Sequence, residues 1–362
     1  MDTPQDFALR LQTYLERLKS GFDRDWRMNV QPSLRESARK LLTDLEIDKM
    51  QDLTQGRLNA LLGQLTETHV EIATKGMLEF SDNLQPLAGF ASGHEVATLS
   101  SIVEKGAIFN SPTAKIAYEY AKQNPIQATG QLLDSFIGSW PEVDAKRIAG
   151  IVRTGWAQNK PLMQMVRETC GTRRNGFEDG ALDVSRRNAG AIIHTATQHT
   201  ANAARMKVFE DNGDIVKGYT WISTLDRRTT PQCRSLDGVS FDAGKGPMPP
   251  LHIRCRSTTV AKLDKKYDFL DEGATRPSSG PSNKSVDADL TYYAWLKQQP
   301  SGFQDIAIGP VRGNLLRNGG LTSERFASLN LGKDFQPLTL LQMKELEPEA
   351  FRRAGILQNT KR

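Results

Sequence analysis

The sequence predicts a mainly α-helical protein with a multi-helix N-terminal part, a small α+β module around residues 216–260 and a helical C-terminal tail. Three observations lead to this fold class. Apolar residues recur at helical spacing through most of the chain, as in Leu58, Leu61 and Leu65. The pattern becomes strand-like only once, at 216–223, where β-branched and aromatic residues gather. The composition, 38% hydrophobic and 25% charged, is that of a globular chain on the polar side of the usual range.

The elements suggest four parts along the chain. Residues 1–140 are predicted to form a helical N-terminal domain, in which one amphipathic stretch repeats apolar residues at Phe7, Leu11, Leu15, Leu18 and Phe22. Residues 141–263 continue as helices and then enter the α+β module, where Asp237-Gly238 is a turn signal. We therefore expect two different architectures to meet inside 141–263.

The last two predicted parts differ sharply in composition. Residues 264–289 are rich in Ser, Pro, Gly and Asp, which favours a flexible linker because few apolar side chains are present to offset the entropy of ordering. Residues 290–362 become apolar again and are predicted to form a helical docking tail, with helices around 292–298, 322–328 and 339–346.

Bulk composition excludes several classes of protein. Cys170, Cys233 and Cys255 are the only cysteines, too few for a disulfide framework, and their odd number favours reduced thiols in a cytoplasm. No apolar run approaches the ~20 residues that a membrane-spanning helix needs. The net charge of +5 permits contact with nucleic acid or an acidic partner but does not require either.

The segment 146–187 is the most basic part of the chain. A solvated helix face is the usual meaning of such charge, and a track that contacts DNA phosphates or an acidic partner is the alternative. The candidate contact residues are Arg147, Arg153, Lys160, Arg173, Arg174, Arg186 and Arg187.

A cluster of rare residue types occupies the α+β module. Cys233, His252 and Cys255 offer soft or borderline ligands suited to zinc, but a structural zinc site normally has four, and Asp226 or Asp242 would be a less typical fourth. A hydrolytic metal site would need a glutamate base nearby, and none is evident. A Cys-His nucleophile pair lacks a recognisable oxyanion loop or orienting residue.

A purely structural role needs no chemistry. In that interpretation Pro249-Pro250 stiffens the loop, Trp221 fills a small core, and Asp226 pairs across the turn with Arg227 and Arg254. All three interpretations, structural, metal-binding and catalytic, remain open from the residues alone, and the structural one is favoured.

The ordered pattern across 221–256 resembles the phage Mu F-like minor head protein family of tailed bacteriophages. It reads Trp-Ile-Ser-Thr-x-Asp-x-Arg-Thr, then Cys, then Leu-Asp-Gly-x-x-Phe, then Pro-Pro-x-His-x-x-Cys-Arg. The residues that carry the resemblance and form the candidate site are Trp221, Asp226, Arg228, Cys233, Asp237, Gly238, Pro249, Pro250, His252, Cys255 and Arg256. A looser resemblance to the tails of such proteins runs from Trp295 to Gly319.

The resemblance also identifies a departure. The family pattern usually carries two more cysteines, where this chain has Thr230 and Ser257. We therefore expect no tightly bound zinc and no other cofactor, with Cys233, His252 and Cys255 retained as a residual scaffold.

The resemblance implies a non-enzymatic minor capsid protein that functions in head morphogenesis, with 141–263 as the Mu F-like core. Its implied place is the virion, at the portal or inner capsid, after assembly in the host cytoplasm. Its implied partners are the portal protein, the major capsid protein and packaged double-stranded DNA, with a role in viral assembly and in DNA packaging or DNA ejection. The alternative is a metal-dependent hydrolase or nuclease that uses the Cys233/His252/Cys255 cluster.

Overall fold

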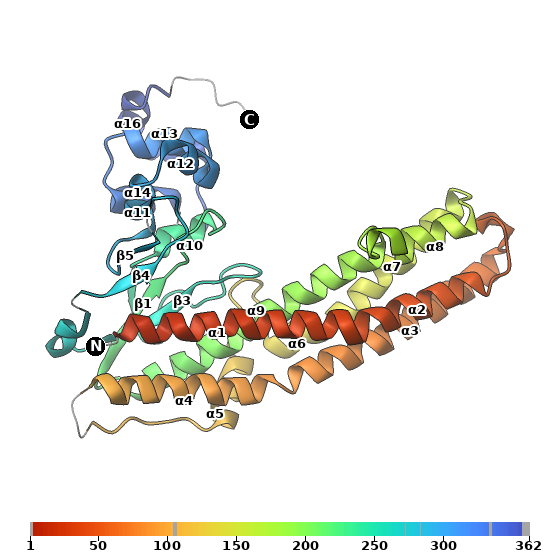
Figure 1. Cartoon of the computed structure of the whole chain (residues 1–362), viewed down its shortest axis with the longest axis horizontal. Helices are drawn as coiled ribbons and strands as arrows, with labels where there is room; N and C mark the ends of the chain where they lie inside the picture. The colour runs from red at the N-terminus through yellow and green to blue at the C-terminus, as the bar shows by residue number, and fades with distance from the viewer. Residues whose placement is uncertain (1–2, 104–106, 272, 283, 333–334, 357–362) are drawn as a thin grey trace.

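The computed structural model describes residues 3–103, 107–271, 273–282, 284–332 and 335–356. Long helices form an extended bundle, and a small sheet and a lobe of short helices lie at one end of it (Figure 1). The bundle helices are α1 (Pro4–Asp25), α2 (Gln31–Thr43), α3 (Gln55–Ser81), α4 (Leu84–Ile102), α5 (Ala114–Gln123), α6 (Leu133–Gly138), α7 (Trp140–Ala157), α8 (Leu162–Cys170) and α9 (Ala181–Asp211).

The apolar faces predicted from the sequence form the core of this bundle. Leu58, Leu61 and Leu65 of α3 are almost completely buried, as are Leu11 and Leu15 of α1. α9, 31 residues long, is buried along much of its length and contributes to two cores. Most of its apolar residues from Leu182 to Ala204 pack into the main bundle core, and those of its last turns pack in the core beside the sheet.

A π-helical segment, Trp26–Val30, joins α1 to α2 without a break in the chain direction. Pro32 follows it, and because proline has no N–H to donate to a preceding turn, a local widening of the helix is the expected response. The segment buries Trp26 and Val30 against α3. Gly76 lies at this contact, where an added Cβ would be 2.6 Å from a Val30 methyl carbon. Close approach of the two helices therefore requires glycine at this position.

The α+β module contains a three-stranded antiparallel sheet in the order β2-β1-β3, built from β1 (Val216–Ile222), β2 (Ser240–Asp242) and β3 (Thr258–Leu263). The short helix α10 (Pro231–Leu236) lies between β1 and β2 in the chain. Tyr219 is paired with Phe241 on one side and with Ala261 on the other. β1 is therefore the central strand, and this agrees with its near-continuous burial.

The segment predicted as a flexible linker, 264–289, contains secondary structure where the structure describes it. A 3₁₀ helix (Lys265–Asp271) is followed by two paired antiparallel strands, β4 (Thr275–Pro277) and β5 (Ser285–Asp287). Arg276 of β4 is only 2% exposed and forms a buried ion pair with Asp237 of the module. The ion pair between Arg276 and Asp237 thus fixes β4 to the α+β module, although the segment around β4 is mostly polar.

The C-terminal lobe consists of helices α11 (Tyr292–Lys297), α12 (Ser301–Ile308), α13 (Pro310–Asn318), α14 (Ser323–Asn330), α15 (Leu340–Leu346) and α16 (Pro348–Arg353). They surround a separate aromatic core that includes Tyr293, Trp295 and Phe326. In Figure 1 the lobe lies beyond the sheet and the bundle extends away from it. The mainly helical fold with a small α+β module is therefore confirmed, and in the described ranges no helix meets the length and apolarity of a membrane span.

Candidate functional site

The 221–256 pattern folds into a compact unit between α9 and the C-terminal lobe. Trp221 on β1 is fully buried and packs with Cys233, Leu236 and Cys255. The indole Nε1 donates a hydrogen bond of 2.9 Å to the hydroxyl of Ser223. That hydroxyl in turn donates to the carbonyl of Cys233 at 2.6 Å. Trp221 is therefore the packing centre on which the first residues of the pattern are assembled.

Asp226 organises the turn before α10. Its Oδ1 accepts the backbone N–H of Arg228 at 2.9 Å and of Thr229 at 3.0 Å. The guanidinium of Arg256 donates to both carboxylate oxygens, at 2.7 and 3.0 Å. The expected partners Arg227 and Arg254 are thus replaced by Arg256 and, at 3.5 Å, by Arg228. Arg254 instead has a positive φ of 60° and donates to the carbonyl of Arg187, so it points toward α9.

Burial by itself raises the pKa of Asp226, but the hydrogen bonds and charge of Arg256 outweigh it and hold the pKa below its usual range. A carboxyl whose folded pKa is depressed contributes stability that is complete above its unfolded pKa of about 3.9. That contribution is lost as the pH falls through the lower, folded value.

We therefore expect the melting temperature to fall on acidification below about pH 4, with part of the fall due to Asp226. Calorimetry of the wild type and of Asp226→Asn across this range measures that part. The variant should be less stable at pH 7 and should converge towards the wild type in acid. A constant difference at every pH would rule out the charged pair as the cause.

Asp237 and Gly238 form the turn between α10 and β2. Gly238 has a φ of +82°, a conformation that residues with a Cβ rarely adopt, so the Asp-Gly signal in the sequence has a backbone reason. Asp237 accepts the backbone N–H of Ser223 at 2.7 Å and pairs with Arg276. Both residues of that ion pair are buried. Asp237 therefore ties β1 to β4, a contact for which the sequence offers no local signal.

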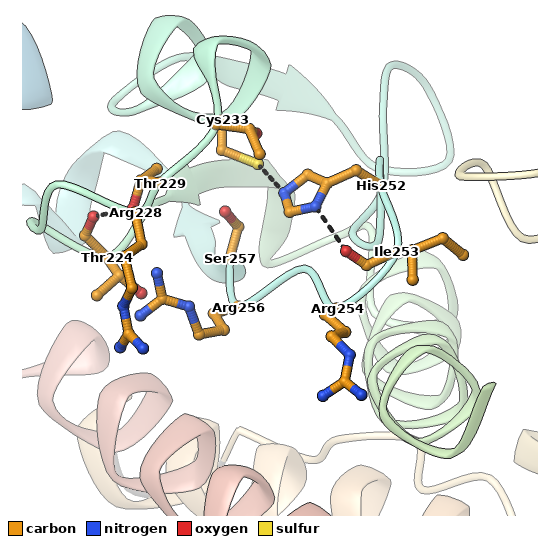
Figure 2. Close-up of a pocket in the computed structure, with 10 residues that line it drawn as sticks. Thr224, Arg228, Thr229, Cys233, His252, Ile253, Arg254, Arg256 and Ser257 are labelled. Carbon is orange, nitrogen blue, oxygen red and sulfur yellow. Dashed lines mark hydrogen bonds between the residues drawn. The ribbon is translucent and has the colours of Figure 1, made fainter. Parts of the chain in front are cut away.

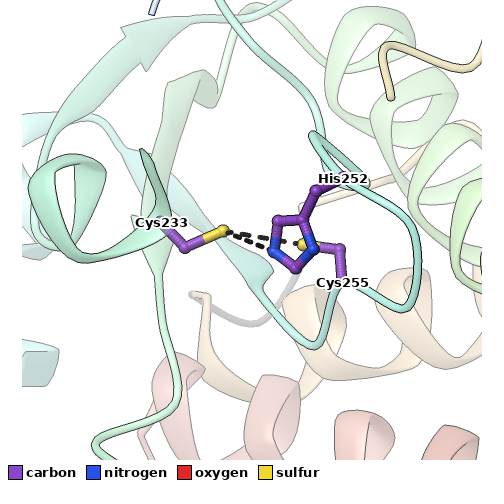
Figure 3. A group of neighbouring side chains, drawn as sticks. All are labelled: Cys233, His252 and Cys255. Atoms are coloured by element: carbon purple, nitrogen blue, oxygen red, sulfur yellow. Dashed lines mark hydrogen bonds between the residues drawn. The ribbon is translucent and has the colours of Figure 1, made fainter. Parts of the chain in front are cut away.

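The loop from Pro249 to Arg256 presents His252 and Cys255 to Cys233. The Pro249-Pro250 peptide bond is cis, and the loop is fixed to α9 where the N–H of Arg254 donates to Thr195 Oγ1 at 3.1 Å. Figure 3 shows the three side chains converging. Cys233 Sγ lies 3.3 Å from His252 Nε2 and 3.7 Å from Cys255 Sγ. The structure therefore brings the three rare residues together, from α10 and from the loop before β3.

The charge state of this cluster follows from its contacts. Burial raises the pKa of Cys255, yet the hydrogen bonds from Cys233 and His252 outweigh it, and the net pKa is well below the usual thiol value. The hydrogen bond to Cys255, together with burial, raises the pKa of Cys233. Burial by itself lowers the pKa of His252, but the interaction with Cys255 outweighs it, so the net pKa of His252 is above its usual value. Cys255 is thus the sulfur best suited to carry negative charge.

A cavity of about 250 Å³ opens beside the cluster (Figure 2). Arg228, Arg254 and Arg256 line it, together with the hydroxyl side chains of Thr230 and Ser257. No carboxylate belongs to the described lining residues. The cavity is therefore cationic, and it lacks a resident acid or base of the Asp/Glu type.

The basic residues singled out in the sequence divide into paired and exposed side chains. Four of them are engaged by carboxylates. Arg147 pairs with Asp144, Lys160 with Glu168, and both Arg186 and Arg187 with Asp183. The other three, Arg153, Arg173 and Arg174, are exposed. They lie on α7 and on the short 3₁₀ helix Arg173–Asn175 that precedes α9.

Sequence reasoning missed three residues that position the site. Arg276 comes from the supposed linker, Ser223 bonds to Trp221, and Tyr292 of α11 donates its hydroxyl to the carbonyl of Asp226 at 2.7 Å. Ser223 lies within the recognised pattern, but nothing marks its hydroxyl as special. Arg276 and Tyr292 reach the site only through tertiary packing.

Comparison with known proteins agrees with the resemblance. The family model described as Phage Mu protein F like protein matches residues 153–260. No curated protein and no solved structure matches the chain. The matched segment runs from α7 into β3 and contains the whole 221–256 pattern with its Cys233, His252 and Cys255 cluster. Residues 153–260, less than a third of the chain, are therefore similar to the phage Mu protein F like family.

Proposed function

We propose that this chain is a minor head protein of a tailed bacteriophage, docked on the portal or the inner capsid, where it assists head assembly. The observation that carries the proposal is the family match over residues 153–260, which supports a phage head-related protein. We further propose that the protein is a minor component of the head and that it contacts the portal and capsid proteins. A role in DNA packaging or ejection is part of the same proposal. The virion is the corresponding location, reached after assembly in the host cytoplasm.

The module has the contacts expected of a scaffold between two docking parts. On one side the loop of His252 is held to α9 through Arg254 and Thr195. On the other side Tyr292 of the C-terminal lobe bonds to the backbone of Asp226. Leu331, which follows α14, also packs against the Trp221 cluster. A unit held from both sides fixes the bundle and the lobe relative to each other, which suits a protein that must present two surfaces.

The absence of a carboxylate among the described lining residues of the cavity favours a non-enzymatic role. A hydrolase or nuclease built on Cys233, His252 and Cys255 would need a group to activate water, and His252 is held by Ile253 and Cys233. We therefore expect His252→Ala heads that have incorporated the protein to infect at close to the wild-type level. Heads that carry the variant and assemble normally but do not infect would give His252 a chemical role.

Packaged double-stranded DNA is a proposed secondary contact through Arg153, Arg173 and Arg174. Because four of the candidate basic residues already face carboxylates, we expect weak binding that weakens further as salt rises. Fluorescence anisotropy with a duplex at several salt concentrations measures this. Replacing both Arg173 and Arg174 with alanine should reduce both the affinity and its salt dependence. Lys245→Ala, which removes one exposed positive charge elsewhere on the surface, should change neither.

The decisive test of the proposed function is incorporation into heads. A tagged copy supplied during infection should be recovered from purified heads at low copy number, and it should capture the portal protein from infected cells. Trp221→Ala should fail in both assays because the module loses its packing centre, whereas Trp221→Phe should be incorporated. Normal, infectious heads that lack the protein altogether would contradict a head role.

A further inference from the structure

We propose that Cys233, His252 and Cys255 form a three-ligand binding site for a zinc-class divalent cation, with the fourth coordination position open to the arginine-lined cavity. The inference goes beyond the proposed head function, since docking does not require a metal. It also departs from the expectation drawn from the sequence, in which Thr230 and Ser257 stand where two further cysteines were expected and leave the set one ligand short.

The distances between the ligand atoms are those that a tetrahedral zinc ion spans. Zn–S bonds of about 2.3 Å and Zn–N bonds of about 2.0 Å at tetrahedral angles place two sulfurs about 3.8 Å apart and a sulfur about 3.5 Å from a nitrogen. Here Cys233 Sγ is 3.7 Å from Cys255 Sγ and 3.3 Å from His252 Nε2. Among the described residues, these three atoms are the only such group, and all lie within 4.8 Å of one another.

The orientation of His252 supports the same conclusion. Its Nδ1 lies 2.9 Å from the carbonyl oxygen of Ile253, and because a carbonyl only accepts, Nδ1 must carry the proton. In the neutral ring, Nε2 then carries the lone pair, and it lies 3.3 Å from Cys233 Sγ. Donation from the second ring nitrogen to a backbone carbonyl is the arrangement that usually fixes a metal-binding histidine.

Two hydroxyl side chains, Thr230 and Ser257, line the part of the cavity beside the cluster. Thr230 Oγ1 is buried and has no hydrogen-bond partner within 3.5 Å of suitable geometry in the described structure. A buried hydroxyl without a partner is costly unless something beside it needs the oxygen. Thr230 and Ser257 both line the cavity next to Cys233 and His252. Water held there would complete four-coordination, as in zinc sites that keep one position open.

Two measurements test the site in the whole chain. Protein purified without chelator should contain about one zinc per chain by elemental analysis. After the metal is removed, titration with Co²⁺ should give thiolate-to-cobalt charge-transfer absorption and the strong visible bands of four-coordinate cobalt. Folded wild-type protein with neither zinc nor a cobalt spectrum would overturn the proposal.

Variants separate the site from a general effect of losing a thiol. Cys255→Ser and His252→Ala should each weaken zinc binding by at least about 100-fold, since even outer-shell changes cost 10–100-fold. Cys170→Ser is the matched control, because Cys170 is also buried but lies at the end of α8, where its sulfur faces the carbonyl of Arg35. Equal loss of metal in Cys170→Ser would overturn the assignment.

A gain-of-ligand variant keeps the test valid if a loss variant does not fold. Thr230→Cys adds a thiolate beside the fourth corner, so zinc should bind more tightly by about tenfold or more, and the charge-transfer band of bound cobalt should intensify. Leu132→Cys, at an exposed site on the bundle, is the control for an added thiol. An affinity unchanged by Thr230→Cys would show that the fourth corner is not where the geometry places it and would overturn the proposal.

Discussion

Trp221→Ala should lower the free energy of unfolding by about 3 to 5 kcal/mol, the range for removing a fully buried large aromatic side chain. The ring is 0% exposed and packs on Cys233, Leu236 and Cys255, with Leu331 from the C-terminal lobe beside it. The substitution removes these contacts, leaves a cavity and deprives Ser223 of the indole N–H. Urea denaturation followed by circular dichroism measures the loss.

Two control variants show whether the loss of stability comes from the loss of the buried ring. Trp221→Phe keeps an aromatic ring in the cluster and should cost clearly less than alanine. Val239→Ala, close by in the module but 39% exposed, should change stability by no more than about 0.5 kcal/mol. A loss below about 1 kcal/mol for Trp221→Ala would mean that the surrounding residues collapse onto the site and that the indole is not the packing centre.

Asp237→Ala should be comparably severe, at about 3 to 5 kcal/mol, because it leaves the guanidinium of Arg276 buried without a counter-charge. Both side chains are almost inaccessible to solvent, at 0% for Asp237 and 2% for Arg276. The substitution also removes the acceptor of the Ser223 N–H. Thermal and urea denaturation measure the effect, and protease cleavage near β4 should increase as the strand loses its anchor.

The control for this carboxylate is Asp242 on the neighbouring strand. Its ion pair with Lys245 is exposed on both sides, at 72% and 78%, so Asp242→Ala should cost no more than about 0.5 kcal/mol. The double variant Asp237→Ala with Arg276→Met removes both buried charges and should recover part of the loss. If the two single losses simply added in the double variant, the buried pair would not be the source of the effect.

The sequence predicted what depends on local pattern. The spacing of Leu58, Leu61 and Leu65 identified a buried helix face, and the single change of period at 216–223 located β1. Gly238 could be identified as a turn residue because its backbone has a positive φ, a conformation for which glycine is the usual residue. The 221–256 pattern also predicted that Cys233, His252 and Cys255 belong to one site, and their side chains lie together in the structure.

What the sequence could not supply depends on contacts between distant segments. Arg276 stands among small polar residues that together resemble a linker, and only the buried Asp237 across the fold makes it an anchor. Asp226 had several arginines within reach along the chain, and the choice of Arg256 over Arg254 is made by the positive φ that turns Arg254 towards α9. Composition averages over a segment, whereas each of these outcomes is decided by one pair of side chains.

The length of α9 has a mechanical consequence. Its 31 residues form a rod of about 46 Å at 1.5 Å per residue. The C-terminal end of the rod is clamped in the core beside the sheet, while its N-terminal end lies in the main bundle core. A tilt of only about 5° at the clamped end would displace the opposite end by about 4 Å, given that length. A small rearrangement at the sheet end of α9 would thus be amplified into a displacement of a few ångströms at its N-terminal end, where the helix contacts α2.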